Sequence, residues 1–326
     1  MTYRTTRPVL LVLGARGLAE FLAAVPAYRA LADIFPRHKR VLAAAASLRS
    51  IVRLCGWFDQ LLPVESPVRL PPLERPNVAV DLRGDDPQSC RALLATRPRS
   101  VIAFARDDVA TTLPGPRWRP LENEVTRWCR LLEYHGIGVN PFRLDLPRPR
   151  AIPPGVRGAT LIHPGTSGPE QPWPPERWVS VARSELAEGR HVVLTGSSAE
   201  RPMISSIAHA AGMSPSAIHA GRTTLRTLAA LVSVAGRVVC SDVGVGQLAT
   251  AMGTPSVVLF GATSPHRWGP PGHRPWHRAL WHGPGGDSEG TVPGGGLVEI
   301  GVDEVLEALA TLPCEATPSY PLRWSA

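Results

Sequence analysis

The sequence contains almost no lysine. Of its 35 basic residues only Lys39 is a lysine, and all the others are arginine. A P-loop NTPase needs the lysine of its phosphate loop, a protein kinase needs a strand lysine, and a pyridoxal-phosphate or Schiff-base enzyme needs a lysine in a cleft. Lys39 stands in His38-Lys39-Arg40, which fits none of these contexts. These enzyme classes are therefore excluded.

Long apolar runs and paired cysteines are also missing. No run reaches the roughly 18 to 20 residues of a membrane helix. The N-terminus leads straight into a short strand-like run, without the apolar region and cleavage site of a secretory signal. We therefore expect a cytoplasmic protein with no transmembrane segment. No Cys-x-x-Cys pair, and so no zinc site or disulfide framework, is formed by Cys55, Cys90, Cys129, Cys240 and Cys314.

The positive charge is concentrated in the N-terminal half. Residues 1–150 hold 23 basic and 14 acidic side chains, whereas residues 151–326 hold 12 and 13. Such a field could steer an anionic ligand towards the first half. The arginine bias of a GC-rich genome explains the same pattern equally well. The dense arginine–aromatic interleaving of a nucleic-acid module is absent, so we expect no nucleic-acid partner.

Strand-like and helix-like segments alternate through both halves of the chain. Residues 141–158 hold five prolines and few core residues, which indicates an interdomain linker. We therefore expect two domains, 1–150 and 151–326. The strand–helix order of the second domain predicts a parallel α/β sheet with ligand loops at the carboxyl ends of its strands.

Four loops of the second half share one design, in which a strand ends, small polar residues follow, and a helix begins. Glycines let the backbone approach an anion, hydroxyls can donate to it, and a helix N-terminus supplies N–H groups without partners. A diphosphate is the expected ligand, although each loop alone could be a plain turn or helix cap. The candidate residues are Thr166 and Ser167, then Thr195 and Gly196, then Gly221, Arg222 and Thr223, then Asp242, Val243 and Gly244.

Several longer motifs occur in a fixed order. They are His163-Pro-Gly-Thr-Ser, Trp173-Pro-Pro-Glu-Arg-Trp178, Ser241-Asp-Val-Gly-Val-Gly-Gln-Leu-Ala249, and the run from Gly253-Thr-Pro to Trp268. Together with the helix that begins near Gly17, they resemble glycosyltransferase family 9, the heptosyltransferase-like enzymes. The similarity runs from about residue 9 to residue 312 with order and spacing intact.

The resemblance implies a GT-B fold, with two Rossmann-like parallel-sheet domains facing a central cleft. It implies an inverting, metal-independent glycosyltransferase without a cofactor. The C-terminal domain would bind a nucleotide-diphosphate sugar, and the N-terminal domain a small-molecule, lipid-linked or glycan acceptor. The family's acidic general base corresponds to Glu20, where the family usually has aspartate. A first-turn glutamate that complements the helix dipole is the structural alternative. Arg16 and Gly17 are further candidate contacts from this domain.

Three positions depart from the family pattern. Gln171 stands where the family has a basic residue near the donor phosphates, and Gln247 where it has a histidine. Ala19 stands where it has a glycine. Arg222, Arg16 or Arg267 could restore the missing charge. The alternative function is therefore a catalytically impaired nucleotide-binding protein that acts as a partner or sensor.

Overall fold

The chain divides into two compact units. The computed structural model describes residues 7–65, 69–71, 73–84, 86–106, 113–166, 172–283 and 296–313. The units are Met1–Leu144 and Asp145–Ala326, so the division comes a few residues before the expected boundary at residue 150. The reason is hydrogen bonding, because the Leu146 N–H donates to Ala251 O at 3.1 Å. The Asp145 carboxylate also lies 3.1 Å from the Arg274 guanidinium.

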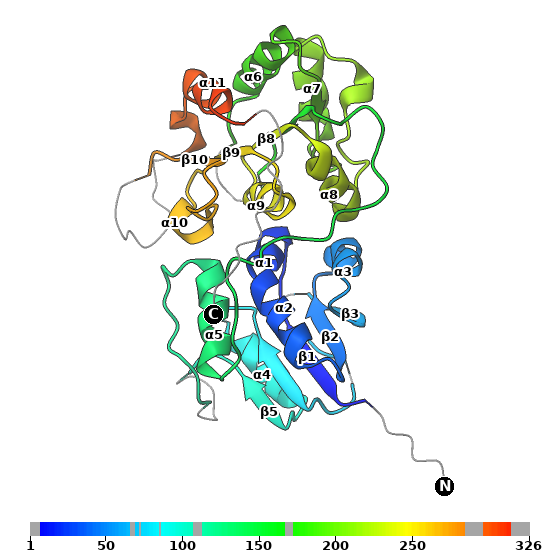
Figure 1. The fold of residues 1–326 in the computed structure, drawn as a ribbon, viewed down its shortest axis with the longest axis vertical. Coiled ribbons are helices and arrows are strands. Elements are labelled where there is room, and N and C mark those ends of the chain that lie inside the picture. The colour runs from blue at the N-terminus through cyan, green and yellow to red at the C-terminus, as the bar shows by residue number, and fades with distance from the viewer. Residues whose placement is uncertain are drawn as a thin grey trace, which may run out of the picture. The chain divides into compact units, whose positions relative to one another are not determined.

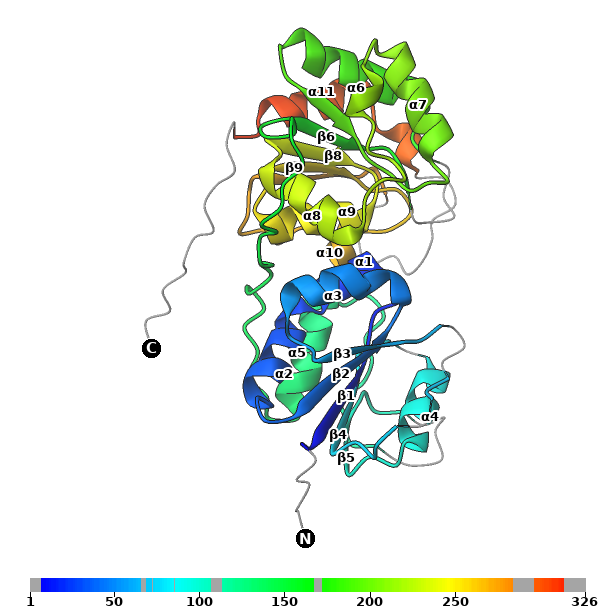
Figure 2. The same ribbon diagram turned by 90° about the vertical axis from the view of Figure 1, so that its right-hand side faces the viewer.

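The first unit is built on a five-stranded parallel sheet with the order β3-β2-β1-β4-β5 (Figures 1 and 2). Its central strand is apolar and buried along its whole length, as expected for a strand covered on both faces. Figure 2 shows α2 and α5 on one face of the sheet and α4 on the other. The strands are β1 (Val9–Leu13), β2 (Lys39–Ala44), β3 (Gln60–Pro63), β4 (Val78–Asp81) and β5 (Ser100–Ile102), and the helices are α1 (Leu18–Ala23), α2 (Val25–Ile34), α3 (Arg49–Cys55), α4 (Pro87–Ala95) and α5 (Glu124–Tyr134).

The second unit is built on another five-stranded parallel sheet, with the order β10-β9-β8-β6-β7. Two parallel-sheet domains confirm the expected α/β class. The strands are β6 (Thr160–His163), β7 (Val192–Leu194), β8 (Arg237–Cys240), β9 (Ser256–Leu259) and β10 (His277–Leu280), and the helices are α6 (Pro175–Ala187), α7 (Arg201–Ala210), α8 (Leu225–Val234), α9 (Val243–Met252), α10 (Pro265–Trp268) and α11 (Val302–Ala310).

The strand order of the second sheet reverses between β6 and β8. The chain goes from β6 to β7 on one side and then reaches β8 on the other side of β6. In open α/β sheets, ligands bind at the carboxyl ends of the strands where the order reverses. The loops that follow β6 and β8 are therefore the first place to look for a site.

The core of the second unit includes two fully buried tryptophans at the start of α6. The rings of Trp173 and Trp178 meet edge to face with centroids 4.6 Å apart. The Trp173 indole N–H donates to Ile300 O at 2.9 Å, which ties the segment before α6 to the segment before α11. Across the residues that the structure covers, no helix is both long and apolar enough to cross a membrane.

One buried histidine makes the second unit sensitive to acid. His277 in β10 is 6% exposed, and burial lowers the pKa of its imidazole to about 3. The unfolded chain takes up that proton below about pH 6.5 and the folded chain does not, so stability falls as the pH drops. Between pH 7.5 and pH 5 we expect this residue to cost about 2 kcal/mol.

Urea unfolding of the wild type and of His277→Gln at the two pH values measures this cost. Glutamine can keep a hydrogen bond to Ser256, whose hydroxyl lies 2.9 Å from His277 Nδ1, and it does not titrate. The variant should therefore lose less stability than the wild type on acidification. An equal loss in both proteins would show that His277 is not the source.

Candidate functional site

The loops after β6 and β8 are joined at the carboxyl edge of the second sheet. The Ser241 hydroxyl lies 3.2 Å from Pro164 O and 3.1 Å from Gly165 O, positioned to donate to both. The Ser241 N–H donates to His163 O at 3.3 Å. Ser241 and His163 are both buried. Two of the four loops selected from the sequence therefore lie side by side.

Helix α9 begins at this junction. Asp242 is 8% exposed and caps the helix, because its Oδ1 accepts the Val245 N–H at 2.9 Å. The amides of Val243 and Gly244 belong to the same first turn, where helix geometry provides no carbonyl partner. A Cβ on Gly246 would lie 2.6 Å from Val258 Cγ2, so α9 packs closely on β9. The result is a helix N-terminus suited to an anion.

The loop after β7 joins the same cluster. The Thr195 hydroxyl lies 2.9 Å from His163 Nδ1 and is fully buried. Glu200 lies against the glycines of two loops, because a Cβ on Gly165 would overlap its carboxylate and a Cβ on Gly196 would lie 3.0 Å from its Oε2. Glu200 and His163 were not among the residues selected from the sequence.

The electrostatics of this edge are set by burial and two carboxylates. Burial lowers the pKa of His163, while the charges of Asp242 and Glu200 act in the opposite direction. A carboxylate accepts hydrogen bonds and repels a phosphate, so these two side chains suit sugar hydroxyls. A diphosphate bound at this edge would need a positively charged group from another loop to offset the two carboxylates.

The fourth loop places an arginine next to the β7 loop. The Gly221 N–H donates to Gly196 O at 3.0 Å. Gly221 has φ +68°, which favours glycine, and a Cβ there would lie 3.0 Å from Ser198 Cα. Arg222 is exposed and Thr223 half-buried. This loop therefore lies against the β7 loop and carries an exposed arginine.

Not every residue selected from the sequence belongs to this cluster. Ser167 and Gln171 lie outside the described residues, whereas Thr166 is described and half-buried. Gln247 lies one turn into α9, and its Nε2 is 3.4 Å from Trp268 O. Its Oε1 is buried and lacks a hydrogen-bond partner in the described part of the chain. Gln247 thus faces α10.

In the first unit, Glu20 occupies the first turn of α1 and is held by Arg16. Its Oε2 accepts the Arg16 N–H at 2.6 Å, and its Oε1 lies 2.9 Å from Arg16 Nε. The hydrogen bond to Glu20 raises the pKa of Arg16. Gly17 is the N-cap residue and has an extended conformation, φ −154°. Glu20 therefore supports the start of the helix, and its side chain as a whole is 25% exposed.

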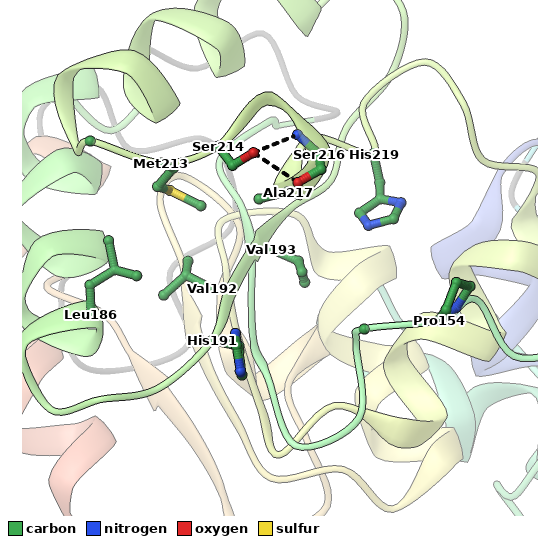
Figure 3. Close-up of a pocket in the computed structure, with 12 residues that line it drawn as sticks. Pro154, Leu186, His191, Val192, Val193, Met213, Ser214, Ser216, Ala217 and His219 are labelled. Carbon is green, nitrogen blue, oxygen red and sulfur yellow. Dashed lines mark hydrogen bonds between the residues drawn. The ribbon is translucent and has the colours of Figure 1, made fainter.

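A cavity of about 460 Å³ lies away from this cluster, between the edge strand β7 and residues 212–219. Figure 3 shows Leu186 and Met213 on one side of it and His219 on the other. None of the residues selected from the sequence lines this cavity. The described residues also contain no group of three histidine, cysteine or acidic side chains that could hold a metal ion.

Sequence comparison connects the chain with sugar-transferring enzymes. Residues 123–282 match the family model described as glycosyltransferase family 9 (heptosyltransferase). Lipopolysaccharide heptosyltransferase 1 of Pseudomonas aeruginosa is 32% identical over 128 residues, which are 39% of this chain and 35% of that protein. The matched segment thus spans about a third of the length of the curated relatives.

Solved structures share the fold over almost the whole chain. E. coli ADP-heptose lipopolysaccharide heptosyltransferase II has a TM-score of 0.70 and 20% identity, covering 93% of this chain and 97% of that chain. TibC from enterotoxigenic E. coli, described as an iron-containing dodecameric glycosyltransferase, has a TM-score of 0.57 and 15% identity, covering 93% and 75%. The chain is therefore similar to the heptosyltransferases of glycosyltransferase family 9 over residues 123–282, and its fold is the GT-B fold of these structural neighbours.

Proposed function

We propose that the protein is an inverting glycosyltransferase that moves a sugar from a nucleoside-diphosphate donor to a hydroxyl group of an acceptor. The observation that carries the proposal is the junction of the β6 and β8 loops at the N-terminus of α9. The names of the relatives make ADP-heptose the first donor to test and a lipopolysaccharide-type saccharide the first acceptor. A cytoplasmic location, expected from the sequence, belongs to the proposal and is tested by cell fractionation.

The second unit would bind the donor. The first-turn amides of Val243 and Gly244 would face the diphosphate, and Arg222 would supply positive charge. The carboxylates of Asp242 and Glu200 would accept hydrogen bonds from sugar hydroxyls. Binding of the departing diphosphate by fixed N–H groups would stabilise the charge that develops as the glycosidic bond breaks.

The first unit would supply the base. Glu20 would take the proton of the acceptor hydroxyl while that oxygen bonds to the anomeric carbon and the nucleoside diphosphate departs with the bonding pair. The partial exposure of its side chain, 25%, supports this role. Because Arg16 holds both carboxylate oxygens, Glu20 must loosen that contact before it can accept a proton.

Release of nucleoside diphosphate from a panel of nucleotide sugars tests the proposal. We expect one donor to be consumed faster when an acceptor saccharide is present, with transfer of the sugar confirmed by mass spectrometry. If no donor is consumed although a nucleotide binds, the protein does not have the proposed transferase activity.

Gln171 stands where the family has a basic residue near the donor phosphates. We predict that Arg222 supplies the positive charge that is missing at that position. Arg222→Ala should weaken donor binding by about 1.5 to 3 kcal/mol, the contribution of a hydrogen bond to a charged group. Isothermal titration with the preferred donor nucleotide measures the change. Arg226→Ala, an exposed arginine of α8, is the matched control and should bind normally. Normal affinity of Arg222→Ala would move the search to Arg16 or Arg267.

The proposal includes transfer without a metal ion. The amides at the start of α9 and the Arg222 guanidinium would carry the charge of the leaving diphosphate. The structural neighbour TibC is described as iron-containing, so metal dependence needs a direct measurement. We expect the transfer rate to be unchanged by EDTA. Activity lost in EDTA and regained with Mg²⁺, Mn²⁺ or Fe²⁺ would refute this part of the proposal.

A further inference from the structure

An arginine of the first unit is buried without a partner for part of its guanidinium. Arg83 follows β4, and β4 pairs with β1 so that Asp81 lies opposite Leu13. The loops after these two strands therefore leave the sheet side by side. Arg83 is 6% exposed, and its Nη1 has no hydrogen-bond partner among the described residues. Burying a cation in this way costs free energy unless something compensates it.

Among the described residues, the carboxylates of Asp81 and Asp86 near Arg83 have other hydrogen-bond partners. Asp81 accepts the Ser89 hydroxyl and the Arg83 backbone N–H, both at 3.0 Å. Burial raises the pKa of Asp81 to about 6. Asp86 caps α4 by accepting the Gln88 N–H at 2.9 Å. None of these contacts neutralises the Arg83 guanidinium by a direct ion pair.

A second guanidinium adds to the positive charge. Arg16 acts on Arg83 by repulsion, which together with burial lowers the pKa of Arg83, whereas the nearby carboxylates oppose this effect. Both oxygens of Glu20 are occupied by Arg16. The Arg16 side chain is 60% exposed, so it can turn towards a ligand. Two arginines therefore lie beside one ion-paired carboxylate at the end of β1 and β4.

We infer that Arg83 and Arg16 together receive an oxyanion of the acceptor, a carboxylate or a phosphate, next to Glu20. Two guanidiniums bind such a group through paired N–H donors. The oxyanion competes with Glu20 for Arg16, and so it frees the carboxylate oxygens that must accept the proton. This inference rests on the proposed function. It adds that binding of the acceptor's oxyanion releases Glu20, the proposed base, from its ion pair with Arg16.

Hydrogen exchange of the full chain tests the inference with inorganic phosphate and with acetate as probes, against chloride at equal ionic strength. At ten times the Kd, exchange of amides in residues 14–20 and 81–84 should slow by roughly tenfold. The probe that reaches full protection at the lower concentration shows whether phosphate or carboxylate is the better ligand. Arg83→Gln should abolish the slowing, and Arg53→Gln, an exposed arginine of α3, should preserve it.

Thermal unfolding separates a ligand-binding role from a structural one. Without added anion, Arg83→Gln should unfold at the same temperature as the wild type or higher, because an incompletely paired buried charge is removed. The inference would be overturned if Arg83→Gln were less stable than the wild type and the anions still slowed its amide exchange as in the wild type. It would also be overturned if neither phosphate nor acetate slowed amide exchange in the wild type. Nucleotide binding by the second unit is measured in parallel. If it persists, the inference about Arg83 fails alone and the proposed function stands.

Discussion

Replacing Glu20 by glutamine is expected to lower the rate of sugar transfer about 10²- to 10⁴-fold, the usual contribution of a general base. The variant keeps the shape of the side chain and removes its basicity. Nucleotide affinity should change little, because Glu20 lies in the first unit and the proposed nucleotide site in the second. Steady-state transfer rates and nucleotide titrations on the same preparations measure the two effects.

Two further variants separate catalysis from helix capping. Glu20→Asp should retain partial activity, because aspartate is the usual residue of the family at this position. Arg16→Ala breaks the ion pair but leaves the carboxylate. If Glu20 only supports the start of α1, then Glu20→Gln and Arg16→Ala should both transfer sugar at the wild-type rate. That outcome would require a different base.

Trp173→Ala is expected to destabilise the second unit by about 3 to 5 kcal/mol, the usual cost of removing a large buried aromatic side chain. The ring is fully buried against Trp178, and its indole N–H donates to Ile300 O. The variant therefore loses packing and leaves a backbone carbonyl with one partner fewer. Urea unfolding monitored by circular dichroism measures the change.

Tyr134→Ala is the control for this variant. Tyr134 ends α5 and is 57% exposed, so its removal should change the free energy of unfolding by less than about 0.5 kcal/mol. A small effect of Trp173→Ala would mean that the segment before α6 does not depend on the tryptophan anchor.

The sequence predicted the sheets better than the ends of the helices. Buried aliphatic runs followed by glycine or polar residues indicated the parallel strands, which the structure confirms. Apolar residues of the segment Leu18–Phe35 recur at the spacing of a single helix, whereas the structure has α1 and α2 with a break at Ala24. Pro26 explains the break, because it has no N–H to donate to the preceding turn.

Other differences have equally local causes. The two glycines of Val243-Gly-Val-Gly246 favour a helix that begins only at Gly246, but α9 begins at Val243, because Asp242 caps it. Strand β10 has no clear signal in the sequence. Its four residues, His277–Leu280, form an edge strand whose two middle side chains are exposed, so no apolar run marks it in the sequence.

The candidate site was predicted in part. The pattern of a strand, a polar loop and a helix predicted the four loops of the second unit. In the structure Ser241 joins the β8 loop to the β6 loop, and Gly221 joins the fourth loop to the β7 loop. The positions of Glu200 and Arg83 could not be inferred from the sequence, because each depends on loops brought together by strand pairing. Arg83 stands in Arg83-Gly84-Asp85-Asp86-Pro87, a pattern typical of an exposed turn, and yet it is 6% exposed.

Hydrogen exchange in the presence of nucleoside diphosphates tests the central claim most directly. With ADP first, followed by UDP, GDP, CDP and dTDP, at least one nucleotide should slow exchange in residues 164–166, 195–198 and 241–246. Residues 212–219, which line the cavity beside β7, should exchange as before. Protection confined to 212–219, or no protection of the three loops by any of the five nucleotides, would contradict the proposed donor site.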